Sequence, residues 1–180
     1  MRTVNVSWDK QAGRFTALGR QPGQVLSINA PALPTEKDRP PTGFSATELL
    51  LAGAGSCSLW DVVEILRKRR AHVDSMDVAV EGHQDADAPW AYRRIGLHYK
   101  IVGEGLKVAV LARVIRLAIV RYCSVIMTIS GVAAIEATVE LVDRDGTTTG
   151  RVPIELAIPS EALPPDLEPT DDEEEPGSPA

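Results

Sequence analysis

The fold is decided by residues 45–70, which read SATELLLAGAGSCSLWDVVEILRKRR. Ser45 and Glu48 form a capping box ahead of a long apolar run, and the basic residues 67–70 complement the helix dipole at the other end. The stretch therefore predicts one long helix. Its apolar side chains lie nearly all round, and such a helix has to be covered on most sides. One sheet of the same chain covers one side only, so we expect a homodimer with an extensive apolar interface.

Small residues interrupt the middle of this expected helix. Gly53 and Gly55 each cost about 1 kcal/mol relative to alanine in a helix interior. On helical geometry, Cys57 shares its face with Gly53, Trp60 and Asp61. The small residues leave room for another element or a substrate at the place where the thiol points.

The chain has two cysteines, Cys57 and Cys123, and both lie in apolar helical stretches. They are too far apart in sequence for a CxxC motif or a tight metal loop. Two interpretations stay open from residue type: a pair of attacking and resolving thiols, or two small buried hydrophobic residues. We expect no metal site, since metal-ligand spacing is also missing from the three histidines, His72, His83 and His98.

Alternating apolar and polar residues predict strands on both sides of the helix. A meander of three short strands, the first half-buried, is followed by a proline-rich loop at 31–44. Two strands follow the central helix, and then come a second helix at about 106–121, a shorter apolar element at 124–130 and two final strands. Strands in blocks separated by helices are typical of an α+β fold with antiparallel sheets. The expected strands are residues 4–8, 11–19, 24–30, 76–80, 95–101, 135–141 and 152–158.

The net charge of −6 is unevenly distributed. Residues 159–180 hold eight acidic residues, six prolines and no basic residue, so the remaining body carries +2. We interpret this end as a disordered acidic tail, and the nearly neutral body predicts no nucleic-acid binding. No stretch of about 18 uncharged apolar residues occurs, so we expect no membrane span. The first residues lack the apolar core of a signal peptide, which predicts a cytoplasmic protein.

Three segments together resemble the OsmC/Ohr family of osmotically inducible and organic-hydroperoxide-resistance proteins. They are residues 45–70 with a CSxxDVV motif at Cys57, residues 97–106, and RYCSVIMTIS at 121–130 with a YCSV motif at Cys123. The likeness covers residues 1–143, leaving an additional strand or hairpin at 144–158 and the tail at 159–180. The resemblance implies an OsmC-like α+β fold, with antiparallel sheets packed on a long central helix in an intertwined homodimer. It also places the active sites at the dimer interface.

The resemblance further implies a thiol peroxidase acting on organic hydroperoxides. Cys57 matches the thiolate that attacks the peroxide, and Cys123 matches the resolving thiol that forms a disulfide with it. An external lipoyl-type dithiol then reduces the disulfide, and no bound cofactor is needed. Arg14 matches the family arginine that stabilises the thiolate, with Arg20 as the alternative. Glu48 lies near the glutamate that pairs with this arginine.

The spacing of Glu48 departs from the family pattern. Glu48 precedes Cys57 by nine residues instead of ten, which puts the two side chains on opposite faces of an ideal helix. Glu48 is also required by the capping box, so we interpret it first as a cap. Two functions therefore stay open: a peroxidase, or a weakly active or inactive OsmC-like dimer that binds a small apolar ligand.

Overall fold

The computed structural model describes residues 3–31, 40–41, 43–156 and 158. Its centre is α1 (Ala46–Lys68), which begins as the sequence predicts. The Ser45 hydroxyl accepts a hydrogen bond from the Glu48 backbone N–H at 3.1 Å, and the Glu48 carboxylate accepts one from the Ser45 backbone N–H at 2.7 Å. Both halves of the capping box are thus present, and they fix the first turn of the helix.

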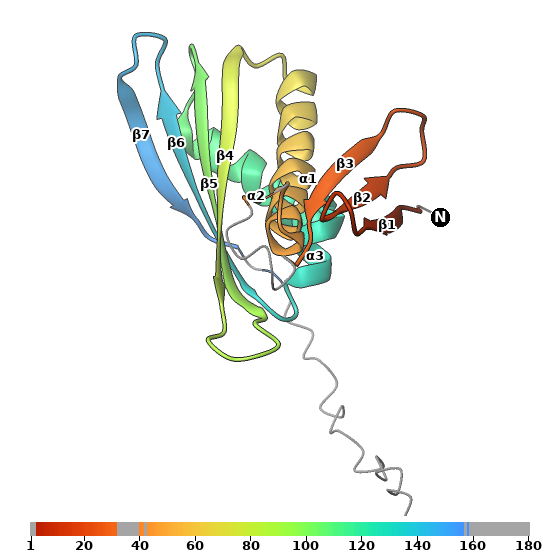
Figure 1. Cartoon of the computed structure of the whole chain (residues 1–180). Coiled ribbons are helices and arrows are strands. Elements are labelled where there is room, and N and C mark those ends of the chain that lie inside the picture. Colours follow the sequence, from red (N-terminus) through yellow and green to blue (C-terminus); the bar gives the residue numbers. More distant parts are fainter. Residues whose placement is uncertain (1–2, 32–39, 42, 157, 159–180) are drawn as a thin grey trace, which may run out of the picture.

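A four-stranded sheet packs against α1, with its strands in the order β4 (Val73–Gln84), β5 (Tyr92–Gly103), β6 (Ala134–Val142) and β7 (Thr148–Ile154). Figure 1 shows α1 between this sheet and the strands of the N-terminal meander. The expectation of antiparallel sheets is wrong for one pair, because β5 and β6 run parallel. The intervening chain crosses over through helices and re-enters the sheet in the same direction. The last strand begins at Thr148, four residues before the expected strand at 152–158, and ends at Ile154.

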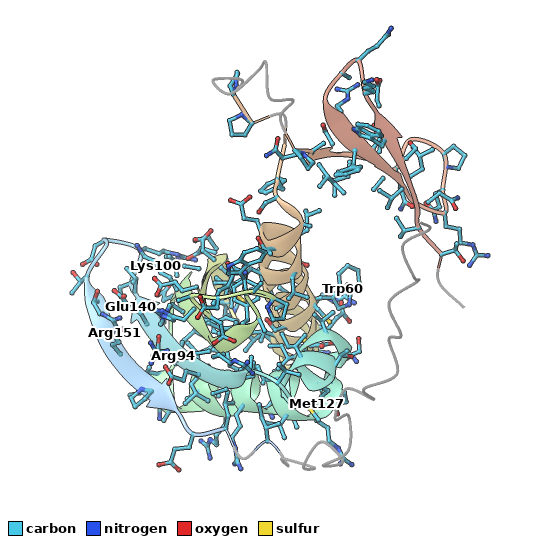
Figure 2. All side chains as sticks on the ribbon, turned by 60° about the horizontal axis from the view of Figure 1, so that its bottom comes forward. Trp60, Arg94, Lys100, Met127, Glu140 and Arg151 are labelled. Carbon is cyan, nitrogen blue, oxygen red and sulfur yellow. The ribbon has the colours of Figure 1, made fainter. Side chains whose placement is uncertain are left out.

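The two faces of this sheet carry different side chains, one apolar and one charged. Because successive residues of a strand point to opposite faces, the strand register decides which residues lie on each face. On the inner face, Ile95, Leu97, Tyr99 and Ile101 are almost completely buried, as their alternation predicts. A row of residues with alternating charge crosses the outer face, where Asp77 lies opposite Lys100 in the strand register, Lys100 opposite Glu140, and Glu140 opposite Arg151. The last three of this row are labelled in Figure 2. Opposite charges on neighbouring strands stabilise the register. Since the inner face is the buried one, the core lies between it and the helices.

The crossover begins as one helix and changes its pitch. The expected second helix is α2 (Val108–Leu117), which continues as a π-helical turn, η1 (Ala118–Tyr122), and leads to the short α3 (Ser124–Ile129). The Cys123 backbone N–H donates to the Ala118 carbonyl at 2.9 Å, which closes the wide turn. The wide turn changes the direction in which the next side chain points, and π turns are frequent at functional sites.

The N-terminal meander is present as a separate three-stranded sheet of β1 (Asn5–Asp9), β2 (Arg14–Leu18) and β3 (Val25–Asn29). It joins the body where the Asn29 N–H donates to the Phe44 carbonyl at 2.9 Å. The expectation of a half-buried first strand is wrong for the single chain, because Val6 and Trp8 are 61% and 59% exposed. The described chain places nothing over this apolar side, and Figure 2 shows the sheet standing away from the body.

The apolar surface of α1 is also largely uncovered. Within the part of the chain that the structure describes, α1 is the one helix long and apolar enough to cross a membrane, and 28% of its most apolar window is buried. Length and composition are weak evidence here, because the central helix of a water-soluble protein passes the same test. The absence of a membrane span stays a prediction.

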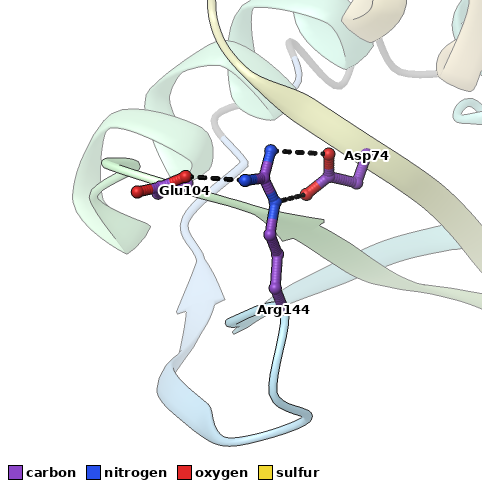
Figure 3. A network of polar contacts seen from close by, with 3 residues as sticks. All are labelled: Asp74, Glu104 and Arg144. Carbon is purple, nitrogen blue, oxygen red and sulfur yellow. Dashed lines mark hydrogen bonds and ion pairs between the residues drawn. The ribbon is translucent and has the colours of Figure 1, made fainter.

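The turn after β6 is tied to the start of β4 and the end of β5, at the same end of the sheet, by a small ionic network. The Arg144 guanidinium donates to both carboxylate oxygens of Asp74, at 2.8 and 3.1 Å, and to Glu104 at 2.8 Å (Figure 3). All three side chains are exposed to solvent, so the network orients the turn more than it stabilises the fold. The expected loop at 31–44 falls partly, and the acidic tail entirely, outside the described residues.

One buried hydrogen-bond chain fastens α1 to the sheet next to Cys57. The Tyr99 hydroxyl on β5 donates to the Ser58 hydroxyl at 2.7 Å, and Ser58 donates to the Gly55 carbonyl at 3.0 Å. Gly55 allows the close approach, because a Cβ there would lie 2.8 Å from Cγ2 of Val80 on β4. Burial raises the pKa of Tyr99, so the phenol stays protonated and remains a donor.

This chain predicts an asymmetric stability effect. Ser58→Ala should destabilise the protein by about 1–3 kcal/mol, because the buried Tyr99 hydroxyl loses its acceptor. Adding Tyr99→Phe should recover most of that loss, since the stranded hydroxyl is then gone. Urea unfolding of both variants at one protein concentration measures the effect. A Ser58→Ala protein as stable as the wild type would contradict the role given to this bond.

Candidate active site

The fold brings the two cysteines together. Cys57 lies on the side of α1 that faces the junction between η1 and α3, and Cys123 occupies that junction. The sulfur atoms of Cys57 and Cys123 and a carboxylate oxygen of Asp61 all lie within 4.8 Å of one another. Both cysteines are free thiols. A side-chain rotation closes a disulfide from such a separation when the backbones are close enough.

The surroundings of Cys57 favour its thiolate form. Burial raises the pKa of Cys57, but hydrogen bonds from the Val125 backbone N–H, the Cys123 thiol and the Ser124 hydroxyl outweigh it and lower the pKa below the ordinary value. The Cys57 sulfur lies 3.9 Å from the Ser124 oxygen. The Val125 N–H belongs to the first turn of α3, where backbone donors have no partner within the helix. The negative charge of Asp61 acts in the opposite sense and raises the Cys57 pKa.

The surroundings of Cys123 favour the protonated thiol. The residue is completely buried, and that burial, together with its hydrogen bond to Cys57 and the Cys57 charge, raises its pKa to about 12. Backbone N–H groups of Ile126 and Val125 oppose the rise but do not cancel it. The pair is thus chemically asymmetric, with a half-buried Cys57 whose pKa is lowered and a buried Cys123 whose pKa is raised.

Cys57 opens into a surface hollow of about 660 Å³. Its walls include Gly53, Trp60, Tyr122 and Val125. Space beyond Gly53 is open, because a Cβ added there would meet nothing within 4 Å. The room that the small residues of α1 predict near the thiol is therefore present. Trp60 projects from α1 on the side away from the four-stranded sheet (Figure 2).

Arg14, Arg20 and Glu48 are not part of this cluster in the single chain. Arg14 is exposed on β2, and Arg20 is exposed in the turn after it. The groups that shift the Cys57 pKa include neither arginine. Glu48 bonds Ser45 and borders a different hollow, whose walls include Phe44. The roles of these three residues at the thiol stay predictions.

The hydrogen-bond donors that Cys57 meets at the start of α3 were not predicted from the sequence. Ser124 and the Val125 N–H follow Cys123 directly, where the YCSV motif runs into an apolar helical segment. A helix beginning there leaves backbone N–H groups free at its first turn, and this signal could have identified them. Asp61 lies on the Cys57 face of α1, as the helical spacing predicts. Its carboxylate pKa is raised by burial. With the two sulfurs it forms the one group of donors close enough to hold a metal ion among the described residues.

The opposing charge of Asp61 predicts a pH effect. Because the thiolate is the reactive form, the rate of Cys57 alkylation should rise with pH and level off below the ordinary thiol pKa. Asp61→Asn should move the midpoint to lower pH, since the carboxylate that disfavours the thiolate is gone. Iodoacetamide labelling followed by mass spectrometry across a pH series measures both midpoints. A midpoint that moves upward in Asp61→Asn would show that the carboxylate does not act by its charge.

Comparison with known proteins identifies the family of this chain. The family model described as OsmC-like protein matches residues 37–140. The protein YhfA of Escherichia coli strain K12 is 36% identical over 98 residues, covering 54% of this chain and 73% of YhfA.

Solved structures show the same fold. The OsmC-like protein from Mycoplasma pneumoniae has a TM-score of 0.65 at 20% identity, covering 79% of this chain and 97% of its own. The organic hydroperoxide resistance protein OsmC from Legionella pneumophila has a TM-score of 0.53 at 14% identity, covering 77% and 96%. At such low identity these structures show the fold alone, and the family is shown by the sequence matches. The chain belongs to the OsmC-like protein family.

Proposed function

We propose that the protein is a two-cysteine peroxidase that reduces organic hydroperoxides. The observation that carries the proposal is the asymmetric pair itself, with an accessible Cys57 of lowered pKa beside a buried Cys123 of raised pKa. A peroxide needs a thiolate that it can reach, and the second thiol must stay nearby and protonated until the first is oxidised. Two cysteines serving only as core residues would not need these opposite surroundings.

In the first step the Cys57 thiolate attacks the outer oxygen of the hydroperoxide. A sulfur–oxygen bond forms, the oxygen–oxygen bond breaks, and the leaving alkoxide takes a proton to become an alcohol. Cys57 is then a sulfenic acid. The Val125 N–H and Ser124 hydroxyl, which hydrogen-bond the Cys57 thiolate, are placed beside the reacting sulfur.

In the second step the Cys123 sulfur attacks the Cys57 sulfur. The disulfide forms, and the hydroxyl of the sulfenic acid leaves as water with the proton of the Cys123 thiol. A small external dithiol of the lipoyl type then reduces the disulfide by exchange and becomes a disulfide itself. The hollow beside Cys57 gives such a reductant access to this sulfur.

The walls of the hollow favour an organic peroxide over hydrogen peroxide. Trp60, Tyr122 and Val125 present apolar surface next to the thiol, and an alkyl group gains free energy by contacting it. Structural neighbours from Legionella pneumophila and Elizabethkingia anophelis are named organic hydroperoxide resistance proteins, which supports the same substrate class.

A second function is favoured by one specific observation. The charged group that shifts the Cys57 pKa is the negative Asp61, which raises it, and Glu48 is engaged as a helix cap. A thiol without a neighbouring cation reacts more slowly. An OsmC-like protein that binds a small apolar ligand in the same hollow, with slow or absent turnover, is therefore the alternative.

Cysteine variants separate the two functions. With cumene hydroperoxide and a dithiol, Cys57→Ser should abolish turnover, because the attacking sulfur is gone. Cys123→Ser should keep the first oxidation and accumulate a Cys57 sulfenic acid that dimedone traps. Consumption of hydroperoxide is followed together with the mass of the trapped protein. If the wild type and Cys57→Ser consume hydroperoxide equally slowly, the ligand-binding function stands instead.

We also propose that the protein acts as a homodimer. Trp60 and Val63 on α1 are 71% and 44% exposed in the single chain, and the apolar side chains of β1 are exposed as well. Exposed apolar surface on two separate elements is typical of an interface. A second copy covers both at once in an intertwined arrangement, and it is also a source of the cation that Arg14 or Arg20 would supply to Cys57.

If the protein is a homodimer, a charged residue in place of Val63 should weaken the association of the two chains without preventing the folding of each chain. In a lone chain Val63→Asp would be tolerated at this half-open position, whereas at an apolar interface it buries an unpaired charge and weakens association. Sedimentation velocity should show a dimer for the wild type and for the control Arg116→Asp, on the exposed side of α2, but a shift to monomer for Val63→Asp. A wild type that sediments as a monomer at micromolar concentration contradicts the proposal.

A further inference from the structure

We propose that Cys57, Asp61 and Cys123 form a zinc-binding site of the reduced protein, and that zinc bound there holds the peroxidase inactive until it is released. The zinc site stands on the geometry of the three side chains. Its regulatory part rests on the proposed peroxidase function. The site is formed in three dimensions from two separate parts of the chain, which is why spacing in the sequence does not reveal it.

The donor atoms are close to the arrangement that zinc requires. The two sulfurs and the carboxylate oxygen lie within 4.8 Å of one another. Zinc–sulfur bonds of about 2.3 Å in tetrahedral geometry place two ligating sulfurs about 3.8 Å apart, so small side-chain rotations complete the set. Cys57 and Asp61 are one turn apart on the same face of α1, so the helix fixes two of the three ligands. Cys123 supplies the third from the η1–α3 junction.

The three ligand groups, two thiolates and one carboxylate, favour zinc over other divalent ions. Two thiolates are soft ligands that favour Zn²⁺ over Mg²⁺ and Ca²⁺, and one carboxylate completes a mixed set that zinc accepts. The hollow lies on the open side of Cys57 and Asp61, so the fourth position is free for water or another small ligand. Three protein ligands with one open position are the arrangement of catalytic zinc sites, whereas structural zinc sites are closed by four protein ligands.

Zinc and peroxide compete for the same two sulfurs. A sulfur bound to zinc shares its electron pair with the ion, so the zinc-loaded protein should react with hydroperoxide only as zinc dissociates, and more slowly than the metal-free protein. Oxidation of both thiolates by one hydroperoxide and two protons gives one disulfide, one alcohol, one water and one free Zn²⁺. The disulfide removes two of the three ligands, so the ion leaves. One disulfide formed should release one zinc ion.

The site is tested by zinc binding to the reduced, full-length protein without oxygen. Competition with a chromophoric zinc indicator should show one Zn²⁺ per chain for the wild type. Cys57→Ser and Cys123→Ser should lose tight binding, and Asp61→Asn should weaken it by about tenfold or more. Glu64→Gln is the matched control, because Glu64 lies on the same helix outside the cluster, where it pairs with Arg67 at 3.1 Å, and binding should be unchanged. Circular dichroism confirms that each variant is folded.

The outcomes are distinct. No zinc binding by the folded wild type overturns the site, and wild-type affinity in Asp61→Asn overturns the role of the carboxylate. One equivalent of cumene hydroperoxide added to the zinc-loaded protein should release zinc in step with disulfide formation. Retention of zinc after the disulfide has formed overturns the coupling. Peroxidase activity in metal-free buffer is measured separately, so a protein that binds zinc but reduces no peroxide refutes the proposed function and leaves the site intact.

Discussion

Everything at the candidate site depends on the contact between the middle of α1 and the η1–α3 junction. That contact holds two sulfurs from distant parts of the sequence within 4.8 Å of each other. On the α1 side it is fixed by the buried Tyr99–Ser58–Gly55 chain, which fastens the helix to β5 one residue after Cys57. On the other side the wide π turn ends at Cys123, whose backbone leaves the helical conformation there. A regular helix continued through 118–122 would point the following side chain elsewhere.

The same contact makes the two thiols unequal. The Cys123 side of the junction is buried, and burial in low dielectric penalises a charge. The Cys57 side is half open and meets the hydrogen-bond donors of the first turn of α3. One short segment, Cys123–Ser124–Val125, thus supplies both the partner thiol and the groups that stabilise the thiolate. The asymmetry needs no cation in the single chain, although a cation from a second copy would increase it.

Much of this arrangement was predictable from the sequence. The capping box at Ser45 and Glu48 predicts the start of α1. The buried face of β5 is predicted by the strict alternation of its apolar residues, Ile95, Leu97, Tyr99 and Ile101. Local patterns carry that information because period and caps are local properties. The parallel pairing of β5 with β6 was not predictable, because it depends on how the crossover packs. The π turn was missed because five residues of wider pitch have the same composition as an ordinary helix end. The Val125 donor was missed because it is a backbone group, which is indicated only indirectly, by the start of a helix directly after Cys123.

The proposed function requires Cys57 and Cys123 to react with a peroxide as one unit. The most direct measurement is the intact mass of the reduced wild-type protein mixed with a single equivalent of cumene hydroperoxide, followed by peptide mapping without reduction. We expect loss of two hydrogen atoms per chain, one equivalent of alcohol, and a single new cross-link that joins the Cys57 peptide to the Cys123 peptide of the same chain. Unchanged thiols, or addition of oxygen to Cys57 without a cross-link to Cys123, would contradict the proposed function.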